Sequence, residues 1–287
     1  VTLNAKRMLV ALLSFAFLVS LLIVAWVEGL KTRLDPTPEP VLIGANKACY
    51  DCHKQKSPAI AEQWNDSRHA RMGVGCYDCH RAEEGDVDAW HHEGQLIATL
   101  VTPNDCSRCH PDVSAEFQAS HHASAGQILG SLDNVLGEIV EGPAAAQSGC
   151  QQCHGAKIAF QLDDAGEIIR DKSGKPMLDT RTWPNSGIGR INLDGSLGTC
   201  SACHSRHRFS IEMARRPDNC GKCHLGPDHP QKEIYEESKH GIAFVTADQQ
   251  GKMHLDKKPW VVGVTYSAAP TCATCHMSAT RNMKATH

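Results

Sequence analysis

The sequence predicts a mostly α-helical domain with irregular loops, preceded by one N-terminal transmembrane helix. Three observations lead to this prediction: an uncharged apolar run near the N-terminus, seven copies of one cysteine–histidine motif, and few alternating strand patterns. Aromatic residues make up only 5% of the 287 residues, which is little for a core of this size. We therefore expect the domain to fold around groups bound at the motifs.

The apolar run covers residues 8–27, MLVALLSFAFLVSLLIVAWV, and contains no charge. Twenty apolar residues are long enough to cross a bilayer as a helix. Lys6 and Arg7 precede the run, and the positive-inside rule then places residues 1–7 in the cytoplasm. A cleaved signal peptide is the alternative, but no small-residue cleavage site follows. Residues 28–44, rich in proline, are predicted to tether a domain over residues 45–287.

The motif Cys-x-x-Cys-His uses all fourteen cysteines. Its spacing is the attachment signature of c-type haem, in which two thiols bond to the porphyrin and the imidazole binds the iron. A zinc site, a redox dithiol or a disulfide also pairs cysteines, but none needs His after every second one. The sequence therefore predicts seven covalently attached haem c groups. The attachment residues are Cys49, Cys52, Cys76, Cys79, Cys106, Cys109, Cys150, Cys153, Cys200, Cys203, Cys220, Cys223, Cys272 and Cys275, and the proximal ligands are His53, His80, His110, His154, His204, His224 and His276.

Spacing between the motifs indicates one domain wrapped on a haem ribbon. The first cysteines of successive motifs lie 27, 30, 44, 50, 20 and 52 residues apart, too unevenly for a tandem array. Residues 155–199 contain DDAGE, DKSGKP and NLDGSLG, which predict hairpins or loops. Helical character is expected in residues 57–72, 114–139 and 231–241, and strand alternation only in residues 260–266.

The formal net charge is −3, and each haem adds two propionates. Many of the 29 lysines and arginines are therefore expected to pair with propionates. The balance is acidic and lacks a basic run, which argues against a nucleic-acid partner.

Ten histidines lie outside the motifs, and each iron has a sixth position to fill. A histidine is more often a surface or core residue, but the number of irons favours ligation here. His254 is the expected surface residue. The distal candidates are His69, one of His91 and His92, one of His121 and His122, His207, His229, His240 and His287.

Five stretches around the motifs resemble the hydroxylamine oxidoreductase-like multihaem cytochromes. They are WNDSRHARMGVGCYDCH, VTPNDCSRCH, SGCQQCHG, WPNSGIGRINLDGSLGTCSACHSRHRFS and CHLGPDHPQKEIYEESKHG. The resemblance implies a helical haem domain, often trimeric, whose fourth haem is catalytic, five-coordinate and open to a small nitrogen substrate. By order, that haem belongs to Cys150, Cys153 and His154. Gly149 and Gly155 flank this motif and would let backbone approach the cofactor, or are ordinary loop residues.

Two departures from the family pattern bear on function. Family members usually carry an eighth motif, so we expect the sequence to be C-terminally incomplete or a shortened member. Hydroxylamine-oxidising members also cross-link the catalytic haem to a tyrosine from a later region that this sequence lacks. The direction of the reaction therefore stays open.

The first hypothesis is an oxidoreductase acting on hydroxylamine or a related nitrogen oxide such as nitrite. His154 would hold the catalytic haem, and Asp228 with His229 or His240 would relay protons, unless either histidine is an axial ligand. The alternative is a membrane-anchored electron carrier with every haem six-coordinate, and a third hypothesis is a structural subunit joining two partners. Either redox function implies export to the periplasmic side of a bacterial inner membrane. The expected partner is a cytochrome or quinone-linked membrane protein, and a homo-oligomer is expected from the resemblance.

Overall fold

The computed structural model describes residues 3–34, 40–128, 139, 142, 149–227, 229–256 and 269–277. The chain divides into two compact units, Val1–Pro40 and Val41–His287. The first contains helix α1 (Leu3–Leu34), so residues 28–34 of the predicted tether are helical. Within the described residues, no helix combines the length and apolar character that crossing a membrane requires. The structure therefore gives the predicted anchor no support.

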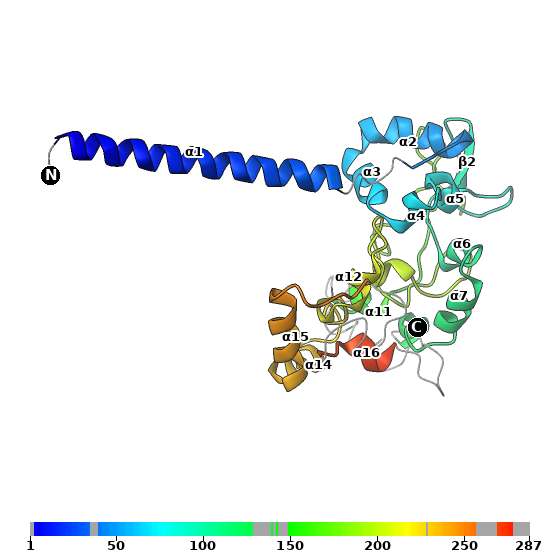
Figure 1. Ribbon diagram of the computed structural model, residues 1–287. Coiled ribbons are helices and arrows are strands. Elements are labelled where there is room, and N and C mark those ends of the chain that lie inside the picture. Colours follow the sequence, from blue (N-terminus) through cyan, green and yellow to red (C-terminus); the bar gives the residue numbers. More distant parts are fainter. Residues whose placement is uncertain are drawn as a thin grey trace. The chain divides into compact units, whose positions relative to one another are not determined.

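The second unit is built from short helices and irregular segments, as predicted (Figure 1). Proline occupies the first turn of α3, α6, α7 and α13, where its fixed φ favours a helix start and its missing N–H costs nothing. The helices of this unit are α2 (Gly44–Lys56), α3 (Pro58–Asn65), α4 (Arg68–Arg71), α5 (Cys76–His80), α6 (Pro103–Ser107), α7 (Pro111–Gln118), α8 (Ala125–Ile128), α11 (Gln151–His154), the 3₁₀ turn η2 (Cys200–Ala202), α12 (Ile211–Arg215), α13 (Pro217–Cys220), α14 (Gln231–Glu237), α15 (Lys239–Gln249) and α16 (Cys272–His276).

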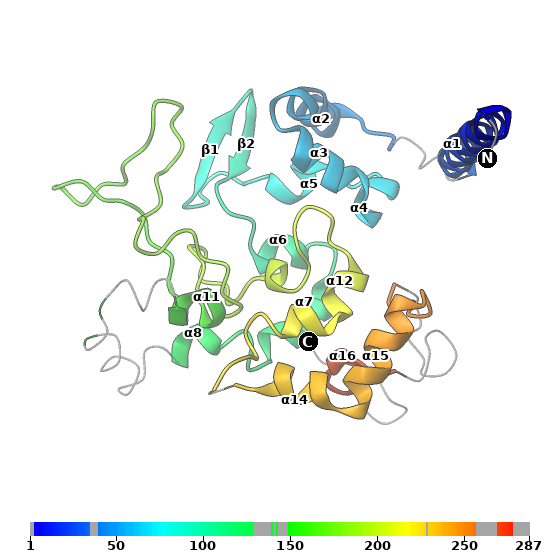
Figure 2. The ribbon, with the colours of Figure 1, turned by 90° about the vertical axis from the view of Figure 1, so that its left-hand side faces the viewer.

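A two-stranded antiparallel hairpin, β1 (Ala89–His92) and β2 (Gln95–Ala98), lies near α2 and α5 (Figure 2). Its two-residue turn places Glu93 at φ 48° and Gly94 at φ 78°. Positive φ at both turn residues matches the right-handed twist of the strands. The sequence analysis missed this hairpin, although the short Glu-Gly turn between AWHH and QLIA was a usable signal.

The predicted loops of residues 155–199 are confirmed as narrow irregular hairpins. Isolated antiparallel bridges join Phe160 to Leu178 and Leu162 to Ile168. The turn between the second pair contains Gly166 at φ 83°, and Asp163 closes it by accepting from the N–H groups of Ala165 and Glu167. Glycine and aspartate at these positions are the turn chemistry that the sequence showed.

Helices lie in all three regions where the sequence predicts helical character. Residues 57–72 form α3 and α4, and residues 231–241 form α14 and the start of α15, which continues to Gln249. Residues 114–128 contain the end of α7 and the whole of α8, which a turn separates. In that turn the Ser120 hydroxyl donates to the Phe117 carbonyl and accepts from the Ala123 N–H. Residues 129–138 and the predicted strand 260–266 lie outside the described residues.

The hydrophobic core is made largely of small side chains. Among the described residues, eight of the fifteen buried hydrophobic residues are alanines. One cluster of larger side chains joins α15 to the segments after it, through Phe244, Met253 and Leu255 together with Ala269. Small buried side chains leave room for bulky cofactors, in agreement with the low aromatic content.

Candidate haem-binding sites

Each haem motif lies on or beside a helical segment, which for the first motif is the thirteen-residue helix α2. The second and seventh motifs are the helices α5 and α16, and the fourth overlaps α11. Residues i, i+3 and i+4 share one face of a helix. Where a motif is helical throughout, as in the first, second and seventh, both thiols and the imidazole therefore project from one side, as haem attachment requires. None of the fourteen cysteines is part of a disulfide.

Residues between and before the cysteines cap these short helices. In the second motif the Asp78 carboxylate accepts from the Gly75 N–H at 2.8 Å, and in the seventh the Thr274 hydroxyl accepts from the Thr271 N–H at 2.9 Å. Before the third motif, Asp105 accepts from the Thr102 N–H at 2.7 Å. Such caps satisfy donors that a short helix leaves unpaired, so the chain itself preforms the attachment turns.

Four proximal histidines face a histidine from outside the motifs. The ring centres lie 6.2 Å apart for His53 and His92, 6.4 Å for His80 and His207, 6.2 Å for His110 and His69, and 6.3 Å for His224 and His122. A metal lies about 2.0 Å from an imidazole nitrogen, and that nitrogen about 1.1 Å from its ring centre, so two rings on one iron stand about 6.2 Å apart. The four pairs therefore fit iron bound between two imidazoles.

Burial keeps several of these rings neutral, the form that binds metal. It lowers the pKa of His80 to about 4, with a further contribution from the positive charge of His207. Burial also lowers the pKa of His207 and, together with His110, that of His69. Two neutral imidazoles at this separation are suited to axial ligation.

The structure distinguishes between adjacent histidines that the sequence left open. Strand β1 turns His91 to solvent and leaves His92 half-buried, because neighbouring side chains of a strand point to opposite faces. In the turn after α7, His121 is exposed and His122 is half-buried. His240 and His254 are exposed, and His287 lies outside the described residues.

The fourth motif has a different environment. His154 faces His229, with ring centres 6.4 Å apart at 84°, but the His229 ring also lies 6.4 Å from His224 of the sixth motif. His229 is exposed, whereas the facing histidines of the four pairs above are half-buried. Within the described residues, the buried Nδ1 of His154 has no hydrogen-bond partner. Asp228, predicted to act with His229, lies outside the described residues.

Close backbone packing fixes the fourth motif. The N–H groups of Ile188 and Gly189 donate to the carbonyls of Cys153 and His154, each at 3.0 Å. Gly155 has φ 84°, and a Cβ there would lie 2.4 Å from the Arg190 backbone nitrogen. A Cβ at Gly149, on the other side of the motif, would meet nothing within 4 Å. Of the two flanking glycines, Gly155 therefore permits the close approach of the Arg190 backbone, whereas the position of Gly149 has room for a side chain.

Electrostatic interactions between thiols, three of them through hydrogen bonds, indicate which motifs are neighbours in space. Cys49 of the first motif interacts with Cys76 of the second, and Cys79 of the second with Cys109 of the third. Cys106 of the third motif interacts with Cys200 of the fifth, and Cys203 of the fifth with Cys220 of the sixth. The sixth motif also interacts with the fourth, through Cys223 and Cys153, and with the seventh, through Cys220 and Cys272. The spatial order thus differs from the sequence order. The first, second, third, fifth and sixth motifs form a continuous row of neighbours. The fourth motif is not part of this row and adjoins only the sixth motif among these interacting pairs.

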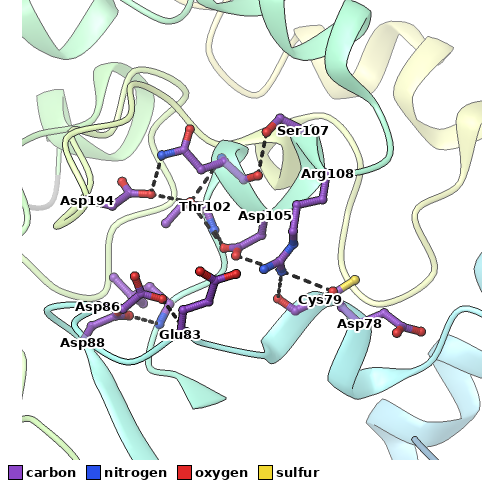
Figure 3. A network of polar contacts seen from close by, with 12 residues as sticks. Asp78, Cys79, Glu83, Asp86, Asp88, Thr102, Asp105, Ser107, Arg108 and Asp194 are labelled. Atoms are coloured by element: carbon purple, nitrogen blue, oxygen red, sulfur yellow. Dashed lines mark hydrogen bonds and ion pairs between the residues drawn. The ribbon is translucent and has the colours of Figure 1, made fainter. Parts of the chain in front are cut away.

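Polar contacts fix the second motif against the third (Figure 3). Arg108, inside the third motif, donates to the carbonyls of Asp78 and Cys79 at 3.2 and 3.4 Å and pairs with Asp105 at 3.0 Å. Because each of these residues belongs to or adjoins a motif, the same contacts would set the distance between two neighbouring haems. The described residues contain no group of three or more His, Cys, Asp or Glu side chains able to hold a metal ion by themselves.

Comparisons with known proteins agree with this geometry. Residues 193–285 match the family model "Seven times multi-haem cytochrome CxxCH", and residues 105–172 match "Cytochrome c554 and c-prime". A probable nitrite reductase-hydroxylamine oxidoreductase fusion protein of Kuenenia stuttgartiensis is 27% identical over 257 residues, which are 80% of this chain and 25% of the relative. The chain is a multihaem cytochrome related to hydroxylamine oxidoreductase-like proteins. The cytochrome spans about a quarter of the length of this curated relative.

Solved structures show the same relation. A hypothetical multihaem protein superposes with a TM-score of 0.73 at 29% identity, over 89% of the cytochrome and 58% of that chain. A reducing HAO-like protein complex of Kuenenia stuttgartiensis has a TM-score of 0.54 at 23% identity, over 81% of the cytochrome and 41% of that chain, and shows likeness of fold alone. The family and the paired histidines together imply covalently bound haem c.

Replacing His92 by Ala should convert one haem from a six-coordinate, low-spin form to a high-spin form, because the ring facing His53 is removed. His91→Ala is the matched control. It should leave the spin state of every haem unchanged, since His91 points to solvent. Electron paramagnetic resonance of the oxidised protein measures both. An equal effect of the two substitutions would show that the strand presents its other face to the haem.

Gly155→Ala should disrupt the fourth site, because the added methyl group would press on the Arg190 backbone and strain a residue at positive φ by about 1–3 kcal/mol. We expect a lower thermal unfolding temperature and loss of haem from the fourth motif. Gly149→Ala, where the methyl group enters open space, should resemble the wild type. Peptide mass spectrometry of the haem-bearing fragments, with thermal unfolding, tests the pair; full haem loading of Gly155→Ala would refute the packing argument.

Proposed function

We propose that the cytochrome converts hydroxylamine or nitrite at the haem of the fourth motif and moves electrons through its other haems. The environment of His154 is the observation that supports this most. The only ring facing it among the described residues is that of His229, which is exposed and lies equally near His224. His224 already faces His122. An iron on His154 would therefore have its other side next to a solvent-accessible imidazole.

In this proposal each residue has one task. His154 holds the iron from its proximal side, and the tight backbone of Gly155, Ile188 and Gly189 keeps that ring in place. A bound haem supplies the iron that takes the substrate nitrogen and exchanges electrons with it. His229, on the opposite side, donates or accepts the protons that every such conversion requires. We assign this task to His229 rather than His240 because the His229 ring faces His154, and Asp228 would orient it.

The spatial order of the motifs gives the proposed electron path. From the fourth haem, electrons would pass to or from the sixth, which adjoins both the fifth and the seventh. The fifth continues to the third, second and first haems. Because the fourth haem would lie beside this row of haems and not within it, it could exchange electrons with the sixth haem without interrupting transfer along the row. The proposal includes seven haems, one at each motif, since each motif has both thiols and a histidine available.

We also propose that the haem domain works outside the cytoplasm, where c-type haem is attached, on the periplasmic side of a bacterial inner membrane. Its redox partner would be another cytochrome or a quinone-linked membrane protein. The protein would function as a homo-oligomer, as the resemblance to trimeric family members implies.

One observation favours an electron carrier without substrate chemistry. The His154 and His229 rings are 6.4 Å apart, the same spacing as in the four pairs that fit iron between two imidazoles. If His229 binds the fourth iron, that iron has no open position, and every haem then serves electron transfer alone.

His229→Ala distinguishes the two functions. If the fourth haem is open, the substitution should leave the number of high-spin haems unchanged and lower turnover of hydroxylamine or nitrite by about 10²-fold or more. If His229 is a ligand, the wild type should show no turnover at this haem and should gain one high-spin haem on substitution. His254→Ala, at an exposed histidine, is the control and should change neither spectrum nor turnover.

Intact-mass analysis of protein matured in a host that attaches c-type haem should show seven covalently bound haems. Haem-bearing peptides from all seven motifs would establish the count. A stable, soluble product with fewer haems would show which motifs are not used.

A further inference from the structure

Arg190 is a buried cation without an anionic partner. Its residue is only 3% exposed, and its guanidinium donates to three neutral oxygens: Asn192 Oδ1 at 2.6 Å, the Asn185 carbonyl at 3.4 Å and the Val101 carbonyl at 3.1 Å. In the described part of the chain, no carboxylate lies within ion-pair distance of this group. Other arginines differ, since Arg181, Arg208 and Arg216 pair with Asp179, Asp66 and Asp248.

A buried guanidinium needs a counter-charge. Burial lowers the pKa of Arg190 to about 10, with a smaller lowering by Arg206 and an opposing contribution from Asp194, which lies beyond ion-pair distance, so the group is still positively charged at neutral pH. A charge removed from water is stable only when it is paired and hydrogen-bonded. Arginine has five N–H donors, and three hydrogen bonds account for three of them. Two donors are left for an anion.

A second unused donor lies in the same loop. Asn185 is 3% exposed, and its side-chain nitrogen has no hydrogen-bond partner within the described residues. The other end of its amide is fixed, because Oδ1 accepts from the Gly187 N–H at 3.2 Å. The Asn185 carbonyl meanwhile accepts from Arg190. The guanidinium of Arg190, which bonds the Asn185 backbone carbonyl, and the side-chain amide of Asn185 thus both have donors to spare. A carboxylate could accept from both.

The position of this loop identifies the source of the carboxylate. Residues 185–192 are hydrogen-bonded through Ile188 and Gly189 to Cys153 and His154 of the fourth motif. Val101, which accepts from Arg190, directly precedes Thr102, the residue that caps the helix leading into the third motif. The Cys200 thiol of the fifth motif interacts electrostatically with Arg190. The guanidinium is therefore close to three haem-attachment sites.

We propose that Arg190 and Asn185 bind a propionate of one of the haems attached at the third, fourth and fifth motifs. The propionate accepts from the two free guanidinium N–H groups and from the Asn185 amide, and it neutralises the buried charge. The loop NSGIGR is thus a cofactor-positioning segment as well as a backbone support for the fourth motif. A free oxyanion such as nitrite offers the same chemistry and is the competing source. The inference rests on haem attachment and is independent of whether the fourth haem turns over substrate.

Potentiometric titration of the haems, followed by visible spectroscopy without substrate, tests the proposal. Arg190→Gln removes the positive charge next to one propionate, so one midpoint potential should shift to a more negative value and become pH-dependent near neutrality. Arg190→Lys keeps the charge and should shift that potential less. Arg181→Gln, at an arginine whose side chain is 84% exposed and paired with Asp179, should leave all midpoints unchanged.

Asn185→Asp is a second variant in case Arg190→Gln does not load haem. It places a carboxylate beside Arg190 that repels the propionate, and it should shift the same midpoint to a more negative potential. Unchanged midpoints in a fully loaded Arg190→Gln or Asn185→Asp protein would overturn the proposal. Weaker binding of nitrite, measured from its spectral change, with all midpoints unchanged would instead assign the site to a free oxyanion and would equally overturn it.

Discussion

The rest of this structure depends on one local constraint, the attachment turn that places two thiols and an imidazole on one side of a helix. A porphyrin bound at that turn has a fixed edge and a fixed axial direction. The chain makes these turns rigid with its own caps, such as Asp78 in the second motif and Thr274 in the seventh. Since most buried hydrophobic residues around them are alanines, the domain gains its apolar bulk from the cofactors.

The residue available for the second axial position of each iron depends on the tertiary structure. Each facing histidine comes from a part of the chain outside the motif that it faces. His92 is brought to His53 by a hairpin, and His207 to His80 by a loop whose Arg208 pairs with Asp66. Four histidine pairs with nearly equal spacing show that the polypeptide specifies the ligand geometry. The fourth motif departs from this pattern in the exposure of its facing residue.

The loop of residues 185–192 links several of these features. Its backbone fixes the fourth motif, its glycines allow contacts that no other residue permits, and its buried Arg190 and Asn185 are the proposed propionate site. The adjoining Asp194 accepts from Thr102 and Asn104 ahead of the third motif. One segment therefore connects haem sites that are distant in sequence. Such a segment can set both the spacing and the potentials of neighbouring haems.

The sequence alone determined the cofactor chemistry, since the motif Cys-x-x-Cys-His is local and its i, i+3, i+4 spacing acts within one helical turn. It also determined the short helices and the turn-rich loops, which follow from proline, glycine and aspartate at fixed positions, although it missed the hairpin of β1 and β2. It could not choose between His91 and His92, or between His121 and His122. Those choices depend on which face of a strand or turn is buried. Nor could it give the order of the motifs in space or single out Arg190, because contacts between segments many residues apart exist only once the chain has folded.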